Sequence, residues 1–373
     1  MQETKHRSLI ARWFFLCPGQ HLLFLFSSGL ILSYFMLRRD LALMTWICDH
    51  ITRPWHRVYS RFCAAVPVSV AALIIAGLVI SVLVYIIFSL FLLLRRKGRA
   101  AQLYRLLFTL TTLVLSIYAL FCLFWGVYYY SSDFEAQSGL EGKPVSAQQL
   151  TRVTNHFVDL VNSYSDQVQR DEAGNFSEDL STIFERSATL YTKVELLYPC
   201  LEGQELPAKP FLFSRAMSYV GFSGFFFPFT GEANINVDCP ACLIPATISH
   251  ELAHQRGVAA EDEANFVAVL AALESGDPVY SYSAALLAYI HLGNALYQAD
   301  YDSWEDLYFR LKPEVLADLR ANNAYWEQFE SPVGEVSDAV YTGFLQSYGQ
   351  ELGLKSYGAC VDLLVAYYEE FCV

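Results

Sequence analysis

Basic residues are scarce in the last two-thirds of the chain. Residues 131–373 contain 12 Lys and Arg against 35 Asp and Glu, a net charge of −23, and no run of basic and aromatic residues. Nucleic-acid binding depends on positive charge that neutralises phosphates, so this composition argues against a nucleic-acid partner. Residues 1–130 differ, because 13 Lys and Arg there outnumber three Asp and Glu.

Charged residues are absent from three long apolar stretches of the first 130 residues. The stretches cover about Trp13–Leu37, Val66–Leu94 and Leu106–Tyr130, and each exceeds the roughly 20 residues that cross a bilayer. No small-residue cleavage site follows the first stretch, which favours a retained anchor over a signal peptide. We expect a multi-pass protein of the cell membrane, with residues 1–130 in contact with the lipid bilayer and residues 131–373 forming a separate domain.

Basic residues near the spans predict the orientation of the chain. Eight of them precede the first span or lie around the loop between the second and third: Lys5, Arg7, Arg12, Arg95, Arg96, Lys97, Arg99 and Arg105. Such residues stay in the cytoplasm, so with three spans the acidic domain is expected to be extracytoplasmic. The first loop opposes this orientation, because it carries five arginines against two aspartates. Its basic and aromatic character is also typical of an interfacial segment.

Paired cysteine motifs of the kind that hold structural zinc are missing. Cys239-Pro240-Ala241-Cys242 has the CxxC spacing, but no second CxxC or Cys/His pair accompanies it, so a zinc knuckle is disfavoured. Five of the nine cysteines lie beyond residue 130, where an oxidising compartment would permit up to two disulfides. One hypothesis is a small disulfide between Cys239 and Cys242.

The run HELAH at residues 250–254 is the strongest functional signal. On a helix, residues four apart share a face, so His250 and His254 can bind one Zn2+ while Glu251 faces the zinc-bound water as a general base. Pro245 suits the first turn of such a helix, and Gly257 suits its end. The pattern predicts metal-assisted hydrolysis; the alternative is a helix that carries two histidines by coincidence.

A catalytic zinc needs a third protein ligand and one position left open for water. The segment after Gly257 is rich in carboxylates, and we expect Glu261 to be that ligand, with Glu263 as the alternative. Asn265 lies four residues after Glu261, on the same face of a helix. Its side chain is therefore expected to orient a ligand by a hydrogen bond.

These residues resemble the gluzincin metallopeptidases. In that family the third ligand is a glutamate, in a pattern such as Glu-x-x-Ala-Asp, on a helix downstream of HExxH. Asn265 stands where many of those enzymes have Asp, which keeps a hydrogen-bond acceptor and loses a charge. The gap between His254 and Glu261 is also shorter than in most gluzincins, so Glu263 stays open as the ligand.

A wider resemblance covers most of the chain. Four segments behind the membrane region are similar to a family of uncharacterised bacterial membrane proteins known by a domain-of-unknown-function label: Gly224–Asn234, Ser249–Gly257, Glu261–Phe266 and Lys355–Leu364. The resemblance implies a membrane-anchored, zinc-dependent, proteolytic protein. It implies no substrate.

The pattern of residues 131–373 predicts one mainly helical (α+β) domain, which we expect to be a zincin-like metallopeptidase domain. Ser146–Val168 and Phe176–Tyr198 have the periodicity of amphipathic helices. Phe225–Asp238 begins with aromatic residues and continues in the alternation of a strand. The alternative for Phe225–Phe229 is an aromatic patch on the membrane-proximal surface.

A strand upstream of the metal-binding helix is where zincin-type peptidases bind extended substrate along an exposed edge. The expected substrate-binding strand here consists of Gly231, Glu232, Ala233 and Asn234. Glu232 invites comparison with aminopeptidases that bind the substrate's free amine through a strand glutamate. An exposed strand glutamate without that role is the simpler interpretation.

Hydrolysis of a peptide also needs a hydrogen-bond donor to the developing oxyanion. The candidates are Tyr282, His291 and Tyr341, and with 24 tyrosines in the chain the sequence does not choose among them. His291 lies in a largely apolar run, where the default interpretation is a hydrogen-bonded core histidine.

These observations predict a membrane-anchored zinc metallopeptidase, an endopeptidase with a peptide or protein substrate. An intramembrane protease is disfavoured, because HELAH lies about 120 residues beyond the third span, amid charged sequence. The alternative from another class is a non-proteolytic sensor or scaffold that retains a zinc site.

Overall fold

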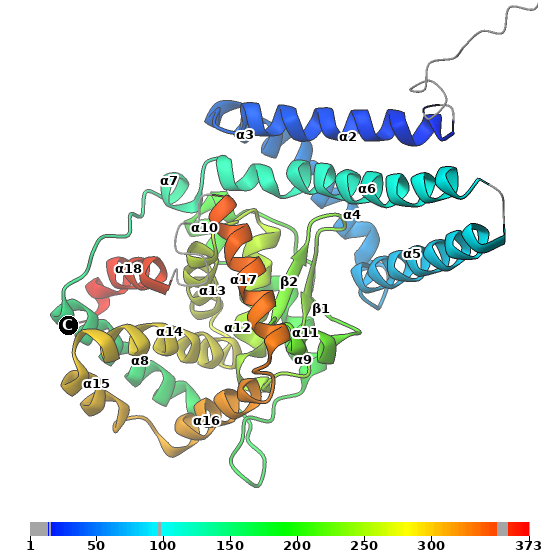
Figure 1. Ribbon diagram of the computed structural model, residues 1–373. Helices are drawn as coiled ribbons and strands as arrows, with labels where there is room; N and C mark the ends of the chain where they lie inside the picture. The colour runs from blue at the N-terminus through cyan, green and yellow to red at the C-terminus, as the bar shows by residue number, and fades with distance from the viewer. Residues whose placement is uncertain (1–13, 15, 96–97, 349–356, 373) are drawn as a thin grey trace, which may run out of the picture.

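The protein is mainly helical, with three long helices on one side and a helical body around a small sheet on the other (Figure 1). The computed structural model describes residues 14, 16–95, 98–348 and 357–372. Several residues named above fall outside these ranges: Lys5, Arg7, Arg12, Trp13, Arg96, Lys97 and Lys355.

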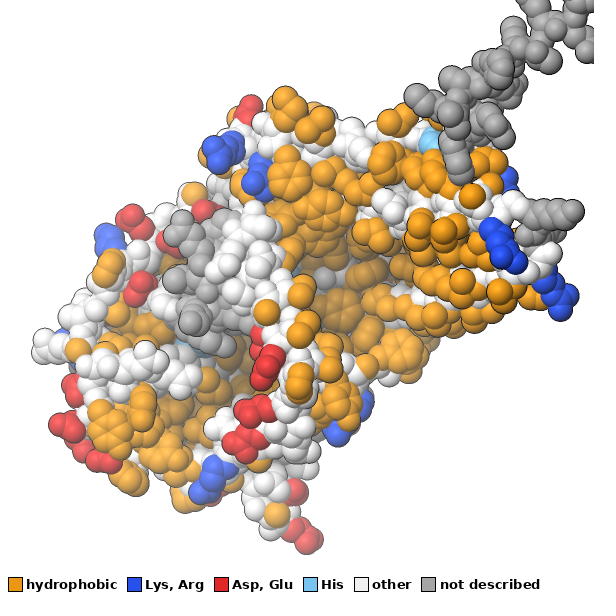
Figure 2. All heavy atoms as spheres, in the orientation of Figure 1, with side chains coloured by type: hydrophobic (Ala, Val, Ile, Leu, Met, Phe, Trp, Pro, Cys, Tyr) orange, Lys and Arg blue, Asp and Glu red, His pale blue; other side chains and the backbone are white. Residues whose placement is uncertain are grey.

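Three helices are long and apolar enough to cross a membrane: α2 (Pro18–Leu37), α5 (Val70–Arg95) and α6 (Arg99–Phe124). Few of their residues are buried, and most hydrophobic side chains of α2 and α5 are exposed, as expected of surfaces that face lipid (Figure 2). α2 and α6 pack side by side, and α5 joins α6 at the end remote from the body (Figure 1). The three candidate spans therefore coincide with the apolar stretches of the sequence.

The third candidate span ends earlier than the sequence suggests. α6 stops at Phe124, and the following residues form a short, largely buried 3-10 helix, η2 (Gly126–Tyr130). Tyr34 of α2 donates a hydrogen bond to the Gly126 carbonyl at 2.8 Å, and a Cβ on Gly126 would lie only 2.9 Å from the Tyr34 hydroxyl. The close approach of α2 at this glycine accompanies the change of helix type, so the helix ends before the expected boundary at Tyr130.

Short helices lead from α2 to α5: α3 (Leu41–Ile47), the π-helical η1 (Cys48–Thr52) and α4 (Arg53–Ala64). Trp55 of α4 stacks on Phe124 at a ring-centroid distance of 4.4 Å and donates a hydrogen bond to the Phe229 carbonyl at 3.1 Å. The basic and aromatic first loop is therefore a folded helical segment that links the end of α6 to the sheet.

The sheet has three short strands in the order β1-β3-β2: β1 (Lys209–Pro210), β2 (Gly224–Phe227) and β3 (Glu232–Ile235). β1 runs parallel to β3, and β2 runs antiparallel to it. The region Phe225–Asp238 thus holds two strands joined by a turn, in which Gly231 has φ +71°. The expected exposed edge at Gly231–Asn234 is wrong, because β3 is the central strand and these residues are buried.

A buried ion pair joins the sheet to α5. Glu232 accepts a hydrogen bond from Lys209 Nζ at 2.9 Å and others from the backbone N–H groups of Val70 and Ala71, in the first turn of α5. Lys209 donates further to three carbonyls of the segment before α5. Glu232 is therefore neither an exposed strand residue nor available for a substrate amine, and both interpretations are wrong.

The body consists of the remaining helices, which surround a hydrophobic core. They are α7 (Phe134–Ser138), α8 (Ala147–Ser165), α9 (Leu180–Arg186), η3 (Ser187–Thr189), α10 (Val194–Leu197), η4 (Pro199–Leu201), α11 (Ser214–Tyr219), η5 (Ala241–Leu243), α12 (Ile244–Gln255), α13 (Glu261–Ser275), α14 (Pro278–Ala299), α15 (Tyr301–Tyr308), α16 (Pro313–Glu327), α17 (Pro332–Ser347), α18 (Tyr357–Tyr368) and η7 (Glu369–Phe371). α14 is buried over most of its length and packs against α8, α12 and α13, so the core lies among these four helices.

The two amphipathic helices expected at the start of the body have different outcomes. Ser146–Val168 is confirmed as α8, which begins at a capping box. Phe176–Tyr198 is wrong as a single helix, because it breaks into α9, η3 and α10. At the break, Ser187 donates from its side chain to the Phe184 carbonyl at 2.6 Å, and bonds of this kind compete with the helical ladder.

All nine cysteines lie in the part of the chain that the structure describes, and all are free. The expected Cys239–Cys242 disulfide is therefore wrong. Cys239 donates instead from Sγ to the Asn236 carbonyl at 2.9 Å, and Cys242 is buried in the core. Burial of both thiols accounts for their position without a cross-link.

Candidate metal centre

Two helices joined by a tight turn carry the centre. α12 has Pro245 in its first turn and ends at Gln255, and the chain then turns at Gly257, whose φ is +91°. A Cβ on Gly257 would lie 2.7 Å from the Tyr128 ring, so the position favours glycine by backbone conformation and by space. The chain enters α13 at Glu261, which the turn directs back toward α12.

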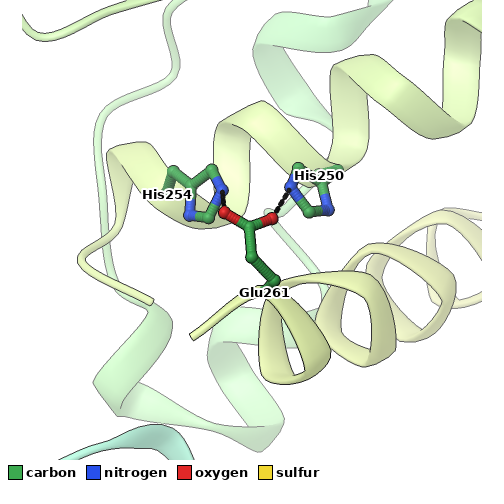
Figure 3. A group of neighbouring side chains, drawn as sticks. All are labelled: His250, His254 and Glu261. Atoms are coloured by element: carbon green, nitrogen blue, oxygen red, sulfur yellow. Dashed lines mark ion pairs between the residues drawn. The ribbon is translucent and has the colours of Figure 1, made fainter. Parts of the chain in front are cut away.

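The two histidines of α12 point toward Glu261 of α13 (Figure 3). The Glu261 carboxylate oxygens lie 3.2 Å from His250 Nε2 and 3.6 Å from His254 Nε2. One atom from each residue lies within 4.8 Å of the others, as ligands of a single metal ion would. Glu263 lies elsewhere, because its Oε1 accepts a hydrogen bond from the Glu135 backbone N–H at 2.9 Å, and the structure does not bring it to the histidines.

Hydrogen bonds behind the rings determine which nitrogens of the histidines carry hydrogen. His250 Nδ1 lies 2.9 Å from Asn265 Oδ1, and His254 Nδ1 lies 2.6 Å from the Val258 carbonyl oxygen. Both partners are acceptors, so each Nδ1 donates its hydrogen, and each Nε2 is left to face Glu261. Asn265 thus occupies the ligand-orienting position that the sequence predicts.

The arrangement favours a positive charge at its centre, which a proton on a histidine or a metal ion can supply. Two imidazole Nε2 atoms and a carboxylate converge, and a positive charge among them is required for all three to attract one another. Burial lowers the pKa of His254, but the nearby Glu261 outweighs burial and raises it to about 9. Burial would raise the pKa of Glu261, yet the two histidines hold it well below its usual range. A zinc ion fits this donor set of two imidazoles and one carboxylate.

Glu251 lies beside the histidines on the cavity side of α12. It is 4% exposed, and among the described residues no group donates a hydrogen bond to its Oε2 atom. Burial raises the pKa of Glu251 to about 7, although the neighbouring histidines act to lower it. A carboxylate with these properties can accept and release a proton near neutrality.

Gly224 of β2 makes room for Glu251. A Cβ on this glycine would lie 2.7 Å from Glu251 Oε1 and 2.9 Å from the Thr247 side chain. Gly224 was not among the site residues expected from the sequence, although a glycine at the start of a run of phenylalanines is a signal for close backbone approach. The strand that borders the centre is therefore β2 and not β3.

A cavity of about 540 Å³ opens onto the group. His291 of α14 and Tyr341 of α17 both line it, and Tyr341 donates a hydrogen bond to Glu261 Oε1 at 2.6 Å. Burial lowers the pKa of His291 to about 4, so its ring is neutral at physiological pH. Two of the three expected oxyanion donors therefore lie near the centre.

Tyr282, the third expected donor, lies outside the residues that line the cavity. Its hydroxyl donates a hydrogen bond to Asp318 and accepts one from Arg170 at 3.1 Å, within the core. The expected role of Tyr282 as an oxyanion donor is wrong, because its hydroxyl is engaged in this buried network.

The end of the third candidate span forms part of the cavity wall. Phe121 of α6 lines the cavity, as do Trp125 and Tyr129, which follow that helix. The Trp125 ring lies edge-on to His254 at a centroid distance of 5.4 Å. These residues are more than 100 positions from HELAH along the chain, and the sequence carries no local signal for the contact.

Comparison with known proteins identifies a family without an assigned activity. The family model described as "Protein of unknown function (DUF3810)" matches residues 49–365. No curated protein and no solved structure matches the chain. The match includes α5, α6 and all three residues of the metal-binding group, and it confirms the domain-of-unknown-function label expected from the sequence.

Proposed function

The chain belongs to the DUF3810 family, and from its own site we propose that it is a membrane-anchored zinc metallopeptidase that hydrolyses peptide bonds. One observation carries the proposal. His250, His254 and Glu261 converge as ligands of one ion would, and Glu251 lies next to them with an oxygen, Oε2, that accepts no hydrogen bond from the described residues.

The ligands in this proposal are His250 Nε2, His254 Nε2 and a Glu261 carboxylate oxygen. Hydrogen bonds from the rings to Asn265 and to the Val258 carbonyl hold both histidines in the required orientation. Among the described residues, no fourth His, Cys, Asp or Glu belongs to the group. A position is thus left for water and substrate, as in catalytic zinc sites.

When bound, zinc would supply Lewis acidity for the attacking water and for the substrate carbonyl. Glu251 takes a proton from the water as the water oxygen bonds to the carbonyl carbon of the substrate. It then gives the proton to the amine nitrogen as the C–N bond breaks. Its burial beside the ligands suits both steps, because a carboxyl group with a pKa of about 7 can act first as a base and then as an acid near neutral pH.

Tyr341 and His291 are the candidates for stabilising the oxyanion. Both line the cavity, and the neutral His291 ring and the Tyr341 hydroxyl each carry a hydrogen that can be donated. The Tyr341 hydroxyl donates a hydrogen bond to Glu261, so it would need only to turn from this ligand to the substrate to stabilise the oxyanion.

We assign the extended substrate to β2 in place of Gly231–Asn234. β2 pairs with β3 along one edge, borders α12, and supplies Gly224, Phe225 and Phe226 to the cavity. A peptide adding to the other edge of β2 would run past Glu251. Because an edge strand lies beside the metal-binding helix, we propose that the body belongs to the zincin-like class.

The basic residues between α5 and α6 support an extracytoplasmic body, against the five arginines of the first loop. Arg95, Arg99 and Arg105 lie at the end of α5 and α6 remote from the body (Figures 1 and 2). The positive-inside rule places that end in the cytoplasm, so the body and its metal centre would face outward.

The alternative function is a sensor or scaffold that keeps zinc without hydrolysis. A structural zinc normally has four protein ligands, and a buried carboxylate with an oxygen that lacks a donor has no role beside such a site. The alternative is therefore the weaker one, and an activity assay separates the two.

The test is cleavage of a random-sequence peptide pool by the purified full chain in detergent, with products identified by mass spectrometry. We expect wild type to cleave the pool, and Glu251→Gln to lose about 10²–10⁴-fold in rate while it keeps zinc. Glu263→Gln is the matched control, because Glu263 lies on α13, as Glu261 does, but away from the cavity. This variant should retain activity. A zinc-loaded wild type that leaves the pool intact would favour the scaffold.

A further inference from the structure

The cavity at the metal centre is shared between the body and the membrane region. Its wall includes Phe121, which lies within the membrane-spanning helix α6, and Trp125, which follows the last residue of that helix. Trp125 contacts His254 directly, ring against ring. One side chain therefore separates the end of a spanning helix from a residue of the metal-binding group.

The length of α6 indicates the level of the centre relative to the bilayer. From Arg105, the last charged residue of α6, to Phe124 the helix rises about 30 Å, which matches the thickness of the hydrocarbon core. Phe124 then falls at the edge of that core. Exposed or half-buried aromatic residues, which are typical of the membrane–water interface, lie at this end of the spans: Trp46, Trp55, Tyr129 and Tyr130. The metal-binding group thus lies at the level of the interface.

Hydrophobic side chains lie beside the cavity on α17 and β2. α17 supplies Asp338, Tyr341 and Phe344 to the cavity wall, and on its outer face Val336 and Val340 are 64% and 68% exposed. Phe225 of β2, which also lines the cavity, packs with Phe211 against α5. Figure 2 shows hydrophobic side chains over most of the spans and acidic side chains on the body. This distribution favours a substrate that approaches along the membrane.

From these contacts we infer that the substrate is a membrane-anchored polypeptide, cut in the segment that directly adjoins its own transmembrane helix. The inference rests on the proposed peptidase function. A segment that leaves the bilayer arrives at the level of Trp125 and His254, and confinement to the membrane raises its local concentration at the cavity. A soluble peptide has neither advantage and must reach a centre that lies at the interface.

The experiment uses the full chain reconstituted in lipid nanodiscs with two peptide pools. One pool carries a 20-residue random segment attached to a polyleucine transmembrane helix, and the other carries the same random segment without an anchor. We expect cleavage of the anchored pool to concentrate within about ten residues of the anchor, and the free pool to be cut on the order of 100-fold more slowly.

Three outcomes are distinguishable. Cuts near the anchor support the inference. Equal rates for the two pools, or cuts spread evenly along the anchored segment, overturn the inference and leave the peptidase intact. A zinc-loaded protein that cuts neither pool, in nanodiscs or in detergent, overturns the peptidase and the inference with it.

A pair of variants in α6 tests the role of the shared wall. Phe121 faces the cavity, where it packs on Phe344 at a centroid distance of 5.6 Å, whereas the neighbouring Leu120 is 44% exposed on the surface of the spans. We expect Phe121→Ala to slow cleavage of the anchored pool several-fold or to move the cut sites, and Leu120→Ala to do neither. Identical rates and cut sites in both variants would contradict a role for this wall.

Discussion

Two regions of the body bury a carboxylate to the same extent and surround it differently. Glu232, at the junction of the sheet with α5, is 5% exposed, and Glu251, at the metal centre, is 4% exposed. Glu232 is paired with Lys209 and accepts further hydrogen bonds from two backbone N–H groups and from the Thr230 hydroxyl. Glu251 has an oxygen without a donor among the described residues, and its pKa is raised.

The difference distinguishes a carboxylate with a full set of partners from one with an unused acceptor. A buried charge is tolerated when its partners satisfy it, and the junction of the sheet with α5 meets that condition. A buried carboxylate oxygen without a donor costs stability, and its retention beside two histidines is the reason for proposing a chemical role for Glu251.

The largest effect is expected at the junction. Lys209→Met leaves the Glu232 charge buried without its partner, and we expect a loss of roughly 3–5 kcal/mol in the free energy of unfolding. Denaturant unfolding in detergent measures it. Lys312→Met is the control, because its pair with Asp166 is exposed, and we expect less than about 1 kcal/mol. Equal losses in the two variants would show that the junction is not a structural ion pair.

Gly224→Ala tests the space beside Glu251. The new Cβ would meet the Glu251 carboxylate and the Thr247 side chain, so Glu251 must move, and a displacement of about 1 Å costs on the order of 10²-fold in rate. Bound zinc should not change, since no ligand is touched. Gly343→Ala, where an added Cβ meets nothing within 4 Å, should leave peptide cleavage unaltered. Full activity in Gly224→Ala would mean that Glu251 does not act from this position.

Asn265→Ala is expected to have the smallest effect. It removes the acceptor that orients His250, and loss of such a partner typically lowers zinc affinity about 10–100-fold. Competition with a zinc chelator measures the change. Asn265→Asp keeps an acceptor at the same place and should retain the affinity. If alanine and aspartate behave alike, the hydrogen bond does not orient His250.

The features that were predictable from the sequence are local ones. The spacing of His250 and His254, the turn at Gly257 and the return of Glu261 all fall within a dozen residues, where helix periodicity and a single glycine determine which side chains meet. The apolar spans were equally visible, because their length and lack of charge suffice.

The features that the sequence did not reveal depend on distant contacts. Glu232 and Tyr282 were both candidates for the site, yet partners elsewhere in the chain hold them in buried networks. Trp125 had no local signal for its contact with His254, and at Gly224 the sequence signals a close approach without naming Glu251 as the partner. Such roles follow from packing, which sequence spacing alone does not specify.

The zinc content of the purified full chain, measured by mass spectrometry of the metal, tests the metal centre itself. We expect about one zinc per chain in wild type, the same content in Glu251→Gln and Glu263→Gln, and a strongly reduced content in Glu261→Ala. Wild-type protein that binds no zinc, or zinc that survives Glu261→Ala and is lost in Glu263→Gln, would contradict the assignment of the metal centre.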